Sequence, residues 1–246
     1  DAKCKINFWL KSLVSLSASL RDLNIPLRII NADNYENTSE VILNFCQKND
    51  ISNIYFNLEY PINELERDRE VYKSIQENGI GVHTFHDQVI HEPGTLKTGA
   101  GNNFSVYSPF KRKWFELLED NMLKLYPVPE VRNDLKQNTS DLSDLLKKYH
   151  SSIGDGWEIG ENWIQKKIHE FLDQKGSKYK DERNFPSIDG CSKLSPYLNA
   201  GVISSKWCLN EAAKRNNGEL SEGDRGIVHW VSAVSYTHLT LPTIYS

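Results

Sequence analysis

Residues 51–87 read ISNIYFNLEYPINELERDREVYKSIQENGIGVHTFHD, and this stretch decides the fold. Its two ends are short runs rich in β-branched and aromatic residues, a composition that favours buried strands. The middle, residues 63–79, is polar and strongly charged and closes on Asn78-Gly79, which is typical of a surface helix and its end. A strand, a helix and a strand joined by short links predict two parallel strands with a crossover helix.

The residues before this stretch repeat the alternation of helix and strand. A three-and-four spacing predicts a helix whose inner face carries Leu10, Leu13, Val14, Ser17 and Leu20. The run PLRIINA at 26–32 predicts a short buried strand. Thr38 can cap a second helix with an inner face of Val41, Ile42 and Phe45. Because residues 1–8 are a poor first strand, we expect the natural chain to start earlier.

The order of these patterns predicts an α/β fold with an N-terminal Rossmann-like parallel-sheet domain at residues 1–125. A loop rich in Gly, Asn and Pro is expected at 91–114, and a long inter-domain linker with one short amphipathic stretch at 126–160. Residues 161–232 are predicted to be the start of an all-α domain. Residues 233–246 form an unmatched tail, because β-branched residues and Pro242 break the helical periodicity there.

Two apolar patterns support the helical assignment. Ser204 can cap a helix that continues through SKWCLNEAAKR, and EGDRGIVHWVSAV is expected to begin another helix. The inner face of the first helix of this domain is expected to carry Trp163, Ile164, Ile168, Phe171 and Leu172.

Composition excludes several classes of function. The 246 residues suit two domains of ordinary size or one large domain, and a net charge of −4 gives no global attraction to DNA or to an anionic membrane. A nucleic-acid site would therefore be a local basic patch. No run approaches the roughly 18 apolar residues that a membrane crossing needs, and residues 1–11 lack the apolar run and cleavage site of a signal peptide. The four cysteines are far apart, which favours reduced thiols in an intracellular protein over a zinc site.

Residues 191–201 read CSKLSPYLNAG and allow two interpretations. Ser192 or Ser195 can cap a helix that has Pro196 at its first position. The backbone N–H groups and hydroxyls at such a helix start can also bind a phosphate. A serine nucleophile is not expected, because no G-x-S-x-G elbow surrounds either serine.

With the preceding YKDERNFPSIDG at 179–190, this stretch resembles the flavin-binding start of the helical domain in the DNA photolyase and cryptochrome family. HWVSAV at 229–234 is similar to the family's tryptophan-containing helix. NLEYPINELERDREV at 57–71 and LKTGAGNNFSVYSPFKRKW at 96–114 resemble segments of its α/β domain. The resemblance runs from Trp9 to Ser232. Among subgroups the sequence looks most like the class I cyclobutane pyrimidine dimer photolyases, in a fungal-like form.

The resemblance implies FAD bound in the helical domain. Tyr179 matches a tyrosine that contacts the flavin nucleotide. The matching phosphate-binding turn consists of Cys191, Ser192, Lys193, Leu194 and Ser195. Cys191 and Lys193 stand where the common form has threonine and arginine. Lysine keeps the positive charge but lacks the guanidinium that can bind a phosphate through two parallel hydrogen bonds. A phosphate contact made by backbone N–H groups would survive both changes.

Further positions match by the same resemblance. Arg183 matches a residue that contacts the DNA backbone, and Trp230 matches a tryptophan that lines the lesion pocket. The family has a glutamate near the lesion where this chain has Ala233, and the following Trp-Arg box is absent. Asn63 and Glu64 match the pair that contacts the folate antenna, 5,10-methenyltetrahydrofolate. From the residues alone, Asn63 could instead cap the helix that begins at Glu64.

What the resemblance implies is a light-driven lyase: reduced FAD donates an electron to a cyclobutane pyrimidine dimer in UV-damaged DNA. We expect a monomer that acts in the nucleus or in mitochondria, with no catalytic side-chain nucleophile and no metal. Residues 1–246 by themselves are expected to bind FAD weakly and to be inactive. A cryptochrome-like photoreceptor without repair activity stays open as the alternative. An ordinary nucleotide-binding α/β protein would need a G-x-G-x-x-G loop, which is not present.

Overall fold

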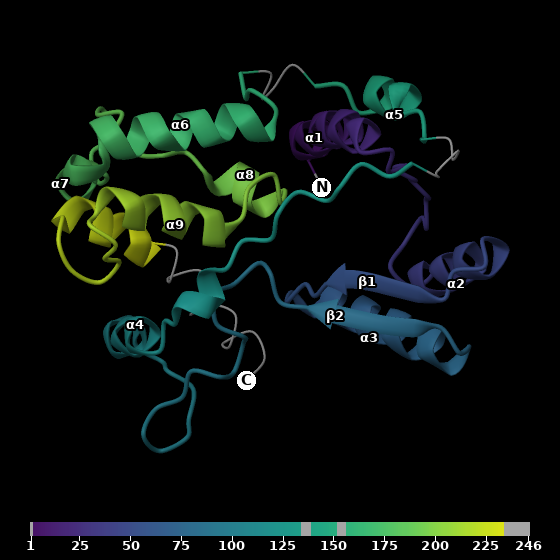
Figure 1. Ribbon diagram of the computed structural model, residues 1–246, viewed down its shortest axis with the longest axis horizontal. Helices are drawn as coiled ribbons and strands as arrows, with labels where there is room; N and C mark the ends of the chain where they lie inside the picture. Colours follow the sequence, from purple (N-terminus) through teal and green to yellow (C-terminus); the bar gives the residue numbers. More distant parts are fainter. Residues whose placement is uncertain (1, 134–138, 152–155, 234–246) are drawn as a thin grey trace.

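A computed structural model describes residues 2–133, 139–151 and 156–233 (Figure 1). In chain order its elements are α1 (Lys3–Asp22), α2 (Thr38–Lys48), β1 (Asn53–Asn57), α3 (Ile62–Glu77), β2 (Gly81–Phe85), α4 (Tyr107–Glu116), η1 (Asp120–Leu123), α5 (Ser143–Lys148), α6 (Glu161–Gln174), η2 (Gly176–Lys178), α7 (Tyr179–Glu182), α8 (Ser195–Asn199) and α9 (Ser205–Arg215). A further helical segment covers 225–233. None of the described helices has the length and apolar character that a membrane crossing requires.

The strand–helix–strand unit predicted from residues 51–87 is confirmed. β1 and β2 are parallel, with a register that runs from Asn53 opposite Gly81 to Asn57 opposite Phe85. The crossover helix α3 packs Ile75, which is fully buried, beneath the two strands together with residues of α2. Gly79 ends α3 with a φ of 77°, a conformation that glycine adopts without strain. The mixed α/β class with a parallel sheet is therefore correct.

The strand expected at 26–32 is not formed. The chain is extended there, but linker residues occupy its backbone groups: Ser140 donates its N–H to the carbonyl of Leu27 at 2.8 Å, and Ile29 donates to Ser140 Oγ at 3.0 Å. A strand joins a parallel sheet only when its own N–H and C=O groups face a neighbouring strand. The prediction was wrong because this segment pairs with the linker instead of with the sheet.

Two other local predictions also differ from the structure. Thr38 does not cap α2, because its hydroxyl donates to the carbonyl of Asn34. The Asn34 side chain instead accepts the N–H of Asn37 at 2.9 Å. The loop expected at 91–114 ends early, since α4 begins at Tyr107. Phe110 and Trp114, which are four residues apart, lie on the same face of this helix and are buried.

The helical part follows the predicted pattern closely. α6 buries Ile164, Ile168, Phe171 and Leu172, with Trp163 partly buried beside them. Ser204 caps α9, and its Oγ accepts the N–H of Trp207 at 3.1 Å. The amphipathic stretch expected inside the linker is α5, and the expected last helix is the segment 225–233. The tail from 234 lies outside the described residues.

One hydrophobic core joins α1 and α4 to the helices of the second half of the chain. It contains Phe8 from α1, Trp114 from α4, Ile168 from α6 and Leu209 from α9.

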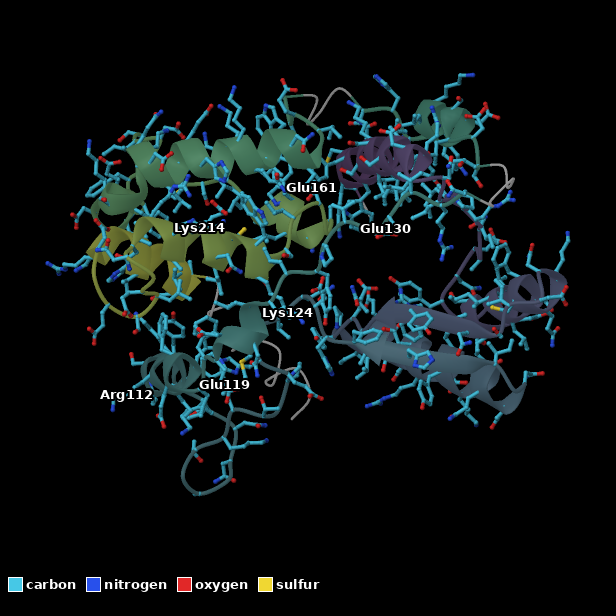
Figure 2. All side chains as sticks on the ribbon, viewed as in Figure 1. Arg112, Glu119, Lys124, Glu130, Glu161 and Lys214 are labelled. Atoms are coloured by element: carbon cyan, nitrogen blue, oxygen red, sulfur yellow. The ribbon has the colours of Figure 1, made fainter. Side chains whose placement is uncertain are left out.

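The domain boundaries at 125, 160 and 232 stay a prediction. Charged side chains on the outside include Arg112, Lys124, Glu130 and Lys214 (Figure 2).

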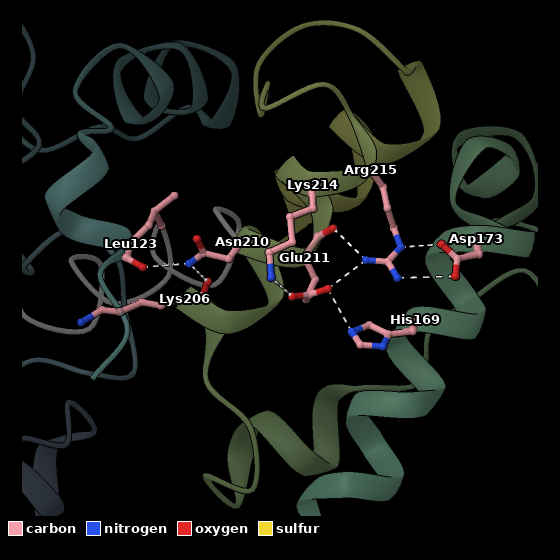
Figure 3. Close-up of polar contacts among 8 residues, drawn as sticks. All are labelled: Leu123, His169, Asp173, Lys206, Asn210, Glu211, Lys214 and Arg215. Carbon is pink, nitrogen blue, oxygen red and sulfur yellow. Dashed lines mark hydrogen bonds and ion pairs between the residues drawn. The ribbon is translucent and has the colours of Figure 1, made fainter. Parts of the chain in front are cut away.

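A polar cluster holds α6 against α9 (Figure 3). The buried carboxylate of Glu211 lies 2.9 Å from both the Arg215 guanidinium and His169 Nε2, and 2.6 Å from Lys214 Nζ. Arg215 also pairs with Asp173 of α6. Burial raises the pKa of Glu211, but the hydrogen bonds from Lys214 and Arg215 outweigh it and the net pKa is lowered. The cluster therefore stabilises the helical pair while Glu211 is ionised.

We expect Glu211→Gln to lower the free energy of unfolding by about 2 kcal/mol at pH 7, because a buried charged acceptor is lost. Since the folded pKa of Glu211 lies below its unfolded value of about 4.3, the contribution is present above that pH and is lost as the pH falls through the folded value. Urea unfolding followed by circular dichroism between pH 3 and 7 measures this. The variant should lose less stability than the wild type on acidification, and parallel pH profiles would contradict the assignment.

Candidate functional site

The turn before α8 is held close to α7. A Cβ at Gly190 would lie 2.6 Å from the Cβ of Glu182, so only glycine allows this approach. Lys193 has a φ of 55°, which points the chain sharply into α8. The residue before α8 is Leu194, and no side chain caps the helix. The expectation that Ser192 or Ser195 caps α8 is therefore wrong.

Ser192 has a different partner. Its Oγ accepts the indole N–H of Trp230 at 3.1 Å. Trp230 is 3% exposed and packs against Phe171 with ring centroids 5.9 Å apart. This bond crosses 38 residues of sequence and anchors the turn to the helical segment 225–233. The structure therefore brings two of the predicted site residues together.

The turn lines a pocket of about 510 Å³. Cys191, Ser192 and Lys193 form one side of it. The other walls come from the segment before α6, from α6 itself and from α8, and include the aromatic rings of Trp157, Trp163, Phe171 and Tyr197. Burial raises the pKa of Tyr197 to about 12, and its hydroxyl donates to the carbonyl of Glu158 at 2.9 Å. A polar turn facing aromatic walls suits a ligand with an anionic part and a flat ring.

The N–H groups of the turn are available to such a ligand. In the part of the chain that the structure describes, no N–H of residues 192–195 donates a hydrogen bond to another group. Next to them, the Ser192 hydroxyl can still donate its own proton, because Trp230 uses only a lone pair of its oxygen. The donor set therefore fits a phosphate group, for which several convergent N–H and O–H donors are the usual partners.

The lysines around the pocket already have partners. Asp189 accepts from Lys175 at 2.6 Å and pairs with Lys193 at 2.7 Å, and these two contacts lower its pKa to about 2. Lys167 pairs with Glu170 at 2.7 Å. An incoming anion must therefore compete with Asp189 for two lysines.

The other predicted site residues of this region lie outside the pocket. Leu194 is buried beneath the turn, and Ser195 is exposed at the start of α8. Tyr179 does not line the pocket, and its ring makes a T-shaped contact with that of Phe171, with ring centroids 6.0 Å apart. The exposed Arg183 places its guanidinium over the ring of Tyr179 at 5.7 Å. The flavin role of Tyr179 stays a prediction.

The DNA role of Trp230 also stays a prediction, and its surroundings do not favour it. A base stacks on an exposed ring face. With 3% of its surface exposed and its N–H bonded to Ser192, Trp230 offers no such face. Its contacts make it a support of the turn.

The predicted antenna pair lies at the start of α3, where Pro61 precedes the first helical residue, Ile62. Asn63 therefore does not cap the helix, and its folate role is untested. Glu64 accepts the hydroxyl of Tyr35 at 2.9 Å, which raises the pKa of Tyr35. A pocket of about 580 Å³ beside β1 includes Tyr35 and Arg67 in its walls but not the pair itself.

Residues that sequence reasoning missed are Trp157, Lys175, Asp189 and Tyr197. Of these, Tyr197 lies inside the quoted turn sequence and could have been included. Asp189 also lies in the quoted stretch 179–190 and could have been included, whereas Trp157 and Lys175 come from earlier segments and are brought to the pocket only by the fold. No group of three or more His, Cys, Asp or Glu side chains in the described residues is arranged to hold a metal ion.

A sequence model of the family described as DNA photolyase matches residues 1–131, more than half of the chain. A deoxyribodipyrimidine photo-lyase of Buchnera aphidicola is 31% identical over 88% of this chain and 45% of the relative. That of Neurospora crassa is 29% identical over 96% of this chain and 41% of the relative. The chain thus spans less than half the length of these two curated relatives.

Solved structures share the fold at low sequence identity. A bacterial class III photolyase from Agrobacterium tumefaciens superposes with a TM-score of 0.80 at 22% identity, over 97% of this chain and 50% of the other. An archaeal photolyase from Sulfolobus tokodaii, described with two FAD molecules, gives a TM-score of 0.71 at 18% identity, over 100% and 49%. A Synechocystis cryptochrome gives 0.70 at 15%, over 98% and 51%.

Proposed function

The chain belongs to the DNA photolyase family, and from that membership we propose that the protein repairs cyclobutane pyrimidine dimers in UV-damaged DNA by light-driven electron transfer from reduced FAD. The observation that carries the proposal is the turn at 191–195. Its N–H groups, which have no partner among the described residues, the Ser192 hydroxyl and the aromatic side chains of the pocket support the placement of a flavin nucleotide there. Curated relatives named deoxyribodipyrimidine photo-lyase support the choice of reaction.

Several residues of this chain have roles in the proposed site. The N–H groups of Ser192 and Lys193, which line the pocket, and the Ser192 hydroxyl would donate to a phosphate of the cofactor. Lys193 and Lys175 would offset its charge. Trp230 holds Ser192 in place, and the aromatic side chains of the pocket would pack against the flat rings of the cofactor. When bound and reduced, FAD supplies the electron that opens the dimer. The protein's part is to bind the cofactor, to orient it toward the lesion and to tune the charge around the flavin.

A folate antenna is the less supported part of the proposal. Asn63 and Glu64 would contact it at the start of α3, by resemblance to the family. The exposed Arg183 would contact DNA on the same basis. Action in the nucleus or in mitochondria, as a monomer, stays a prediction.

A cryptochrome-like photoreceptor without repair activity is the second candidate. The observation that favours it is Ala233, which stands where the family has a glutamate near the lesion. The same flavin turn would serve both functions, so the turn does not separate them.

The test is a repair assay on the full-length protein with reduced FAD and an oligonucleotide that contains one thymine dimer. Blue light should restore the intact thymines, and samples kept in the dark should stay unchanged. Flavin binding without any light-dependent repair would reject the lyase and leave the photoreceptor.

We expect Asp189→Asn to tighten FAD binding about threefold, because two partly exposed ion pairs that compete with the phosphate are removed. Flavin fluorescence titration of the full-length protein measures the affinity. The exposed Asp22→Asn on α1 changes the net charge equally and should leave the affinity unchanged. Weaker binding in Asp189→Asn would show that this carboxylate organises the turn instead of competing with the ligand.

A further inference from the structure

Another pocket lies where α1 meets the helical part of the chain (Figure 1). Its volume is about 400 Å³, within the range of sites for small molecules. Its lining residues come from one face of α1, from the start of α6, from the end of α8 and the residues after it, and from Glu59, which follows β1. It is called the α1 pocket. It shares no lining residue with the pocket beside the turn at 191–195, so the two pockets are distinct.

Contacts around the α1 pocket hold its walls in place. The ring of Phe8 on α1 meets that of Tyr197 on α8 edge-on, with centroids 5.3 Å apart, and both residues are buried. A Cβ at Gly160 would lie 3.5 Å from Ser15 Oγ, so the backbone at the start of α6 runs close to α1. The pocket is therefore formed before a ligand enters, which lowers the entropic cost of binding.

The apolar part of the lining contains an indole ring. Trp9 of α1 is partly buried and lines the α1 pocket together with Leu13, Leu16 and Val202. Lys5 Nζ lies 4.5 Å from the centroid of the Trp9 ring, so this indole already attracts one ammonium group. Among aromatic side chains, indole binds cations best. A ligand with an apolar body and a positive charge therefore finds a suitable surface here.

Negative charge prevails in the polar part of the lining. Its two charged side chains, Glu59 and Glu161, are carboxylates, and no lysine, arginine or histidine of the described residues lines the pocket. Glu59 already pairs with Arg67 at 2.6 Å. Glu161 is exposed in the first turn of α6 (Figure 2), and its carboxylate accepts the side-chain N–H of Gln165 at 3.0 Å. Within the described part of the chain Glu161 forms no ion pair, so it is the carboxylate that an incoming cation meets without a competitor.

Hydroxyl and carbonyl oxygens add acceptors to the lining. The Ser12 hydroxyl donates its proton to the carbonyl of Phe8 at 2.9 Å, and the Ser19 hydroxyl donates to that of Ser15 at 3.4 Å. Both hydroxyls thus offer lone pairs to a ligand. At the end of α8, no backbone N–H of the described residues donates to the carbonyl of Ala200. These oxygens suit the N–H donors of an ammonium group.

We propose that the α1 pocket binds a small organic ammonium ion, which packs its apolar body against Trp9 and donates to the carboxylate of Glu161. The proposal goes beyond the proposed function and does not rest on it, because a cation is opposite in charge to a flavin phosphate and to DNA. An anionic ligand would be repelled by the two carboxylates of the lining. Since the ligand contacts α1, α6 and the end of α8 together, its binding also stabilises the packing of these helices.

Three probes of similar size test the charge of the ligand. At pH 7, 2-phenylethylammonium is cationic, 2-phenylethanol is neutral and phenylacetate is anionic. Isothermal titration calorimetry on the full-length protein should show that the ammonium binds about tenfold more tightly than the alcohol, and that phenylacetate does not bind. Equal affinities for the ammonium and the alcohol, or no binding of the ammonium at millimolar concentration, would overturn the proposal.

Glu161→Gln tests the carboxylate. It should weaken binding of 2-phenylethylammonium about fivefold and leave binding of 2-phenylethanol unchanged. Glu40→Gln is the matched control, because Glu40 is also an exposed carboxylate in the first turn of a helix, α2, and does not line the α1 pocket. The control should change the affinity less than twofold. An equal effect of the two variants would mean that the ammonium senses only the net charge of the protein, and the site would be wrong.

Ser12→Leu tests the location of the bound probe. The larger side chain occupies part of the α1 pocket and should weaken both the ammonium and the alcohol at least fivefold, roughly, while circular dichroism shows a folded protein. Unchanged affinity in the folded variant would place the probe elsewhere. FAD affinity should stay at the wild-type value, because the two pockets have no residue in common. If Ser12→Leu does not fold, the comparison of Glu161→Gln with Glu40→Gln decides.

Discussion

Gly226→Ala is expected to lower the free energy of unfolding by about 3 kcal/mol. A Cβ at this position would overlap the backbone carbonyl oxygens of Gly176 and Ser177 in η2. Backbone atoms cannot move aside as a flexible side chain can, so the segment 225–233 would be pushed away from η2. Trp230 and Val231, both buried, lie on that segment. The cost therefore combines a steric overlap with loss of core packing.

Urea unfolding followed by circular dichroism measures this effect. Gly99→Ala is the matched control, because a Cβ at Gly99 meets no atom within 4 Å. It should stay within about 0.5 kcal/mol of the wild type. If the two alanine variants unfold at the same urea concentration, the close packing of 225–233 on η2 is not real.

Trp230→Ala is expected to cost about 3–5 kcal/mol, because a large buried ring is replaced by a cavity. Trp230→Phe should cost less, since it keeps an aromatic ring against Phe171 but loses the N–H that Ser192 accepts. The turn then loses its anchor, so FAD affinity should fall in Trp230→Phe even though the protein is folded.

A double-mutant cycle separates packing from the hydrogen bond. Ser192→Ala and Trp230→Phe each remove the same bond, so the double variant should be more stable than the sum of the two losses implies, by about 1 kcal/mol. Simple additivity in unfolding free energy would mean that the two residues do not interact.

Local sequence patterns predicted the elements that depend on local chemistry. The unit at 51–87 combines strand composition, helix periodicity and a closing Asn-Gly, and all three agree with the structure. The cap by Ser204 also depends only on nearby residues. The strand expected at 26–32 failed because its outcome was decided by Ser140, which is more than 100 residues away.

In the candidate site, too, the sequence predicted what depends on nearby residues and missed what depends on residues distant in sequence. Resemblance located the turn at 191–195 from its residues and spacing. It did not show that the Ser192 hydroxyl accepts from Trp230, or that Asp189 occupies the two lysines, because these contacts exist only after folding.

The most direct test of the account is FAD binding set against riboflavin binding, because riboflavin has the flavin ring but no phosphate. In the full-length protein, the exposed Lys193→Glu should weaken FAD at least tenfold and leave riboflavin affinity unchanged. Lys48→Glu, on the exposed surface of α2, controls for net charge. A selective loss of FAD affinity in Lys193→Glu is the predicted result. Unchanged FAD affinity, or an equal loss for both ligands, would contradict the assignment of residues 191–195 as the flavin phosphate site.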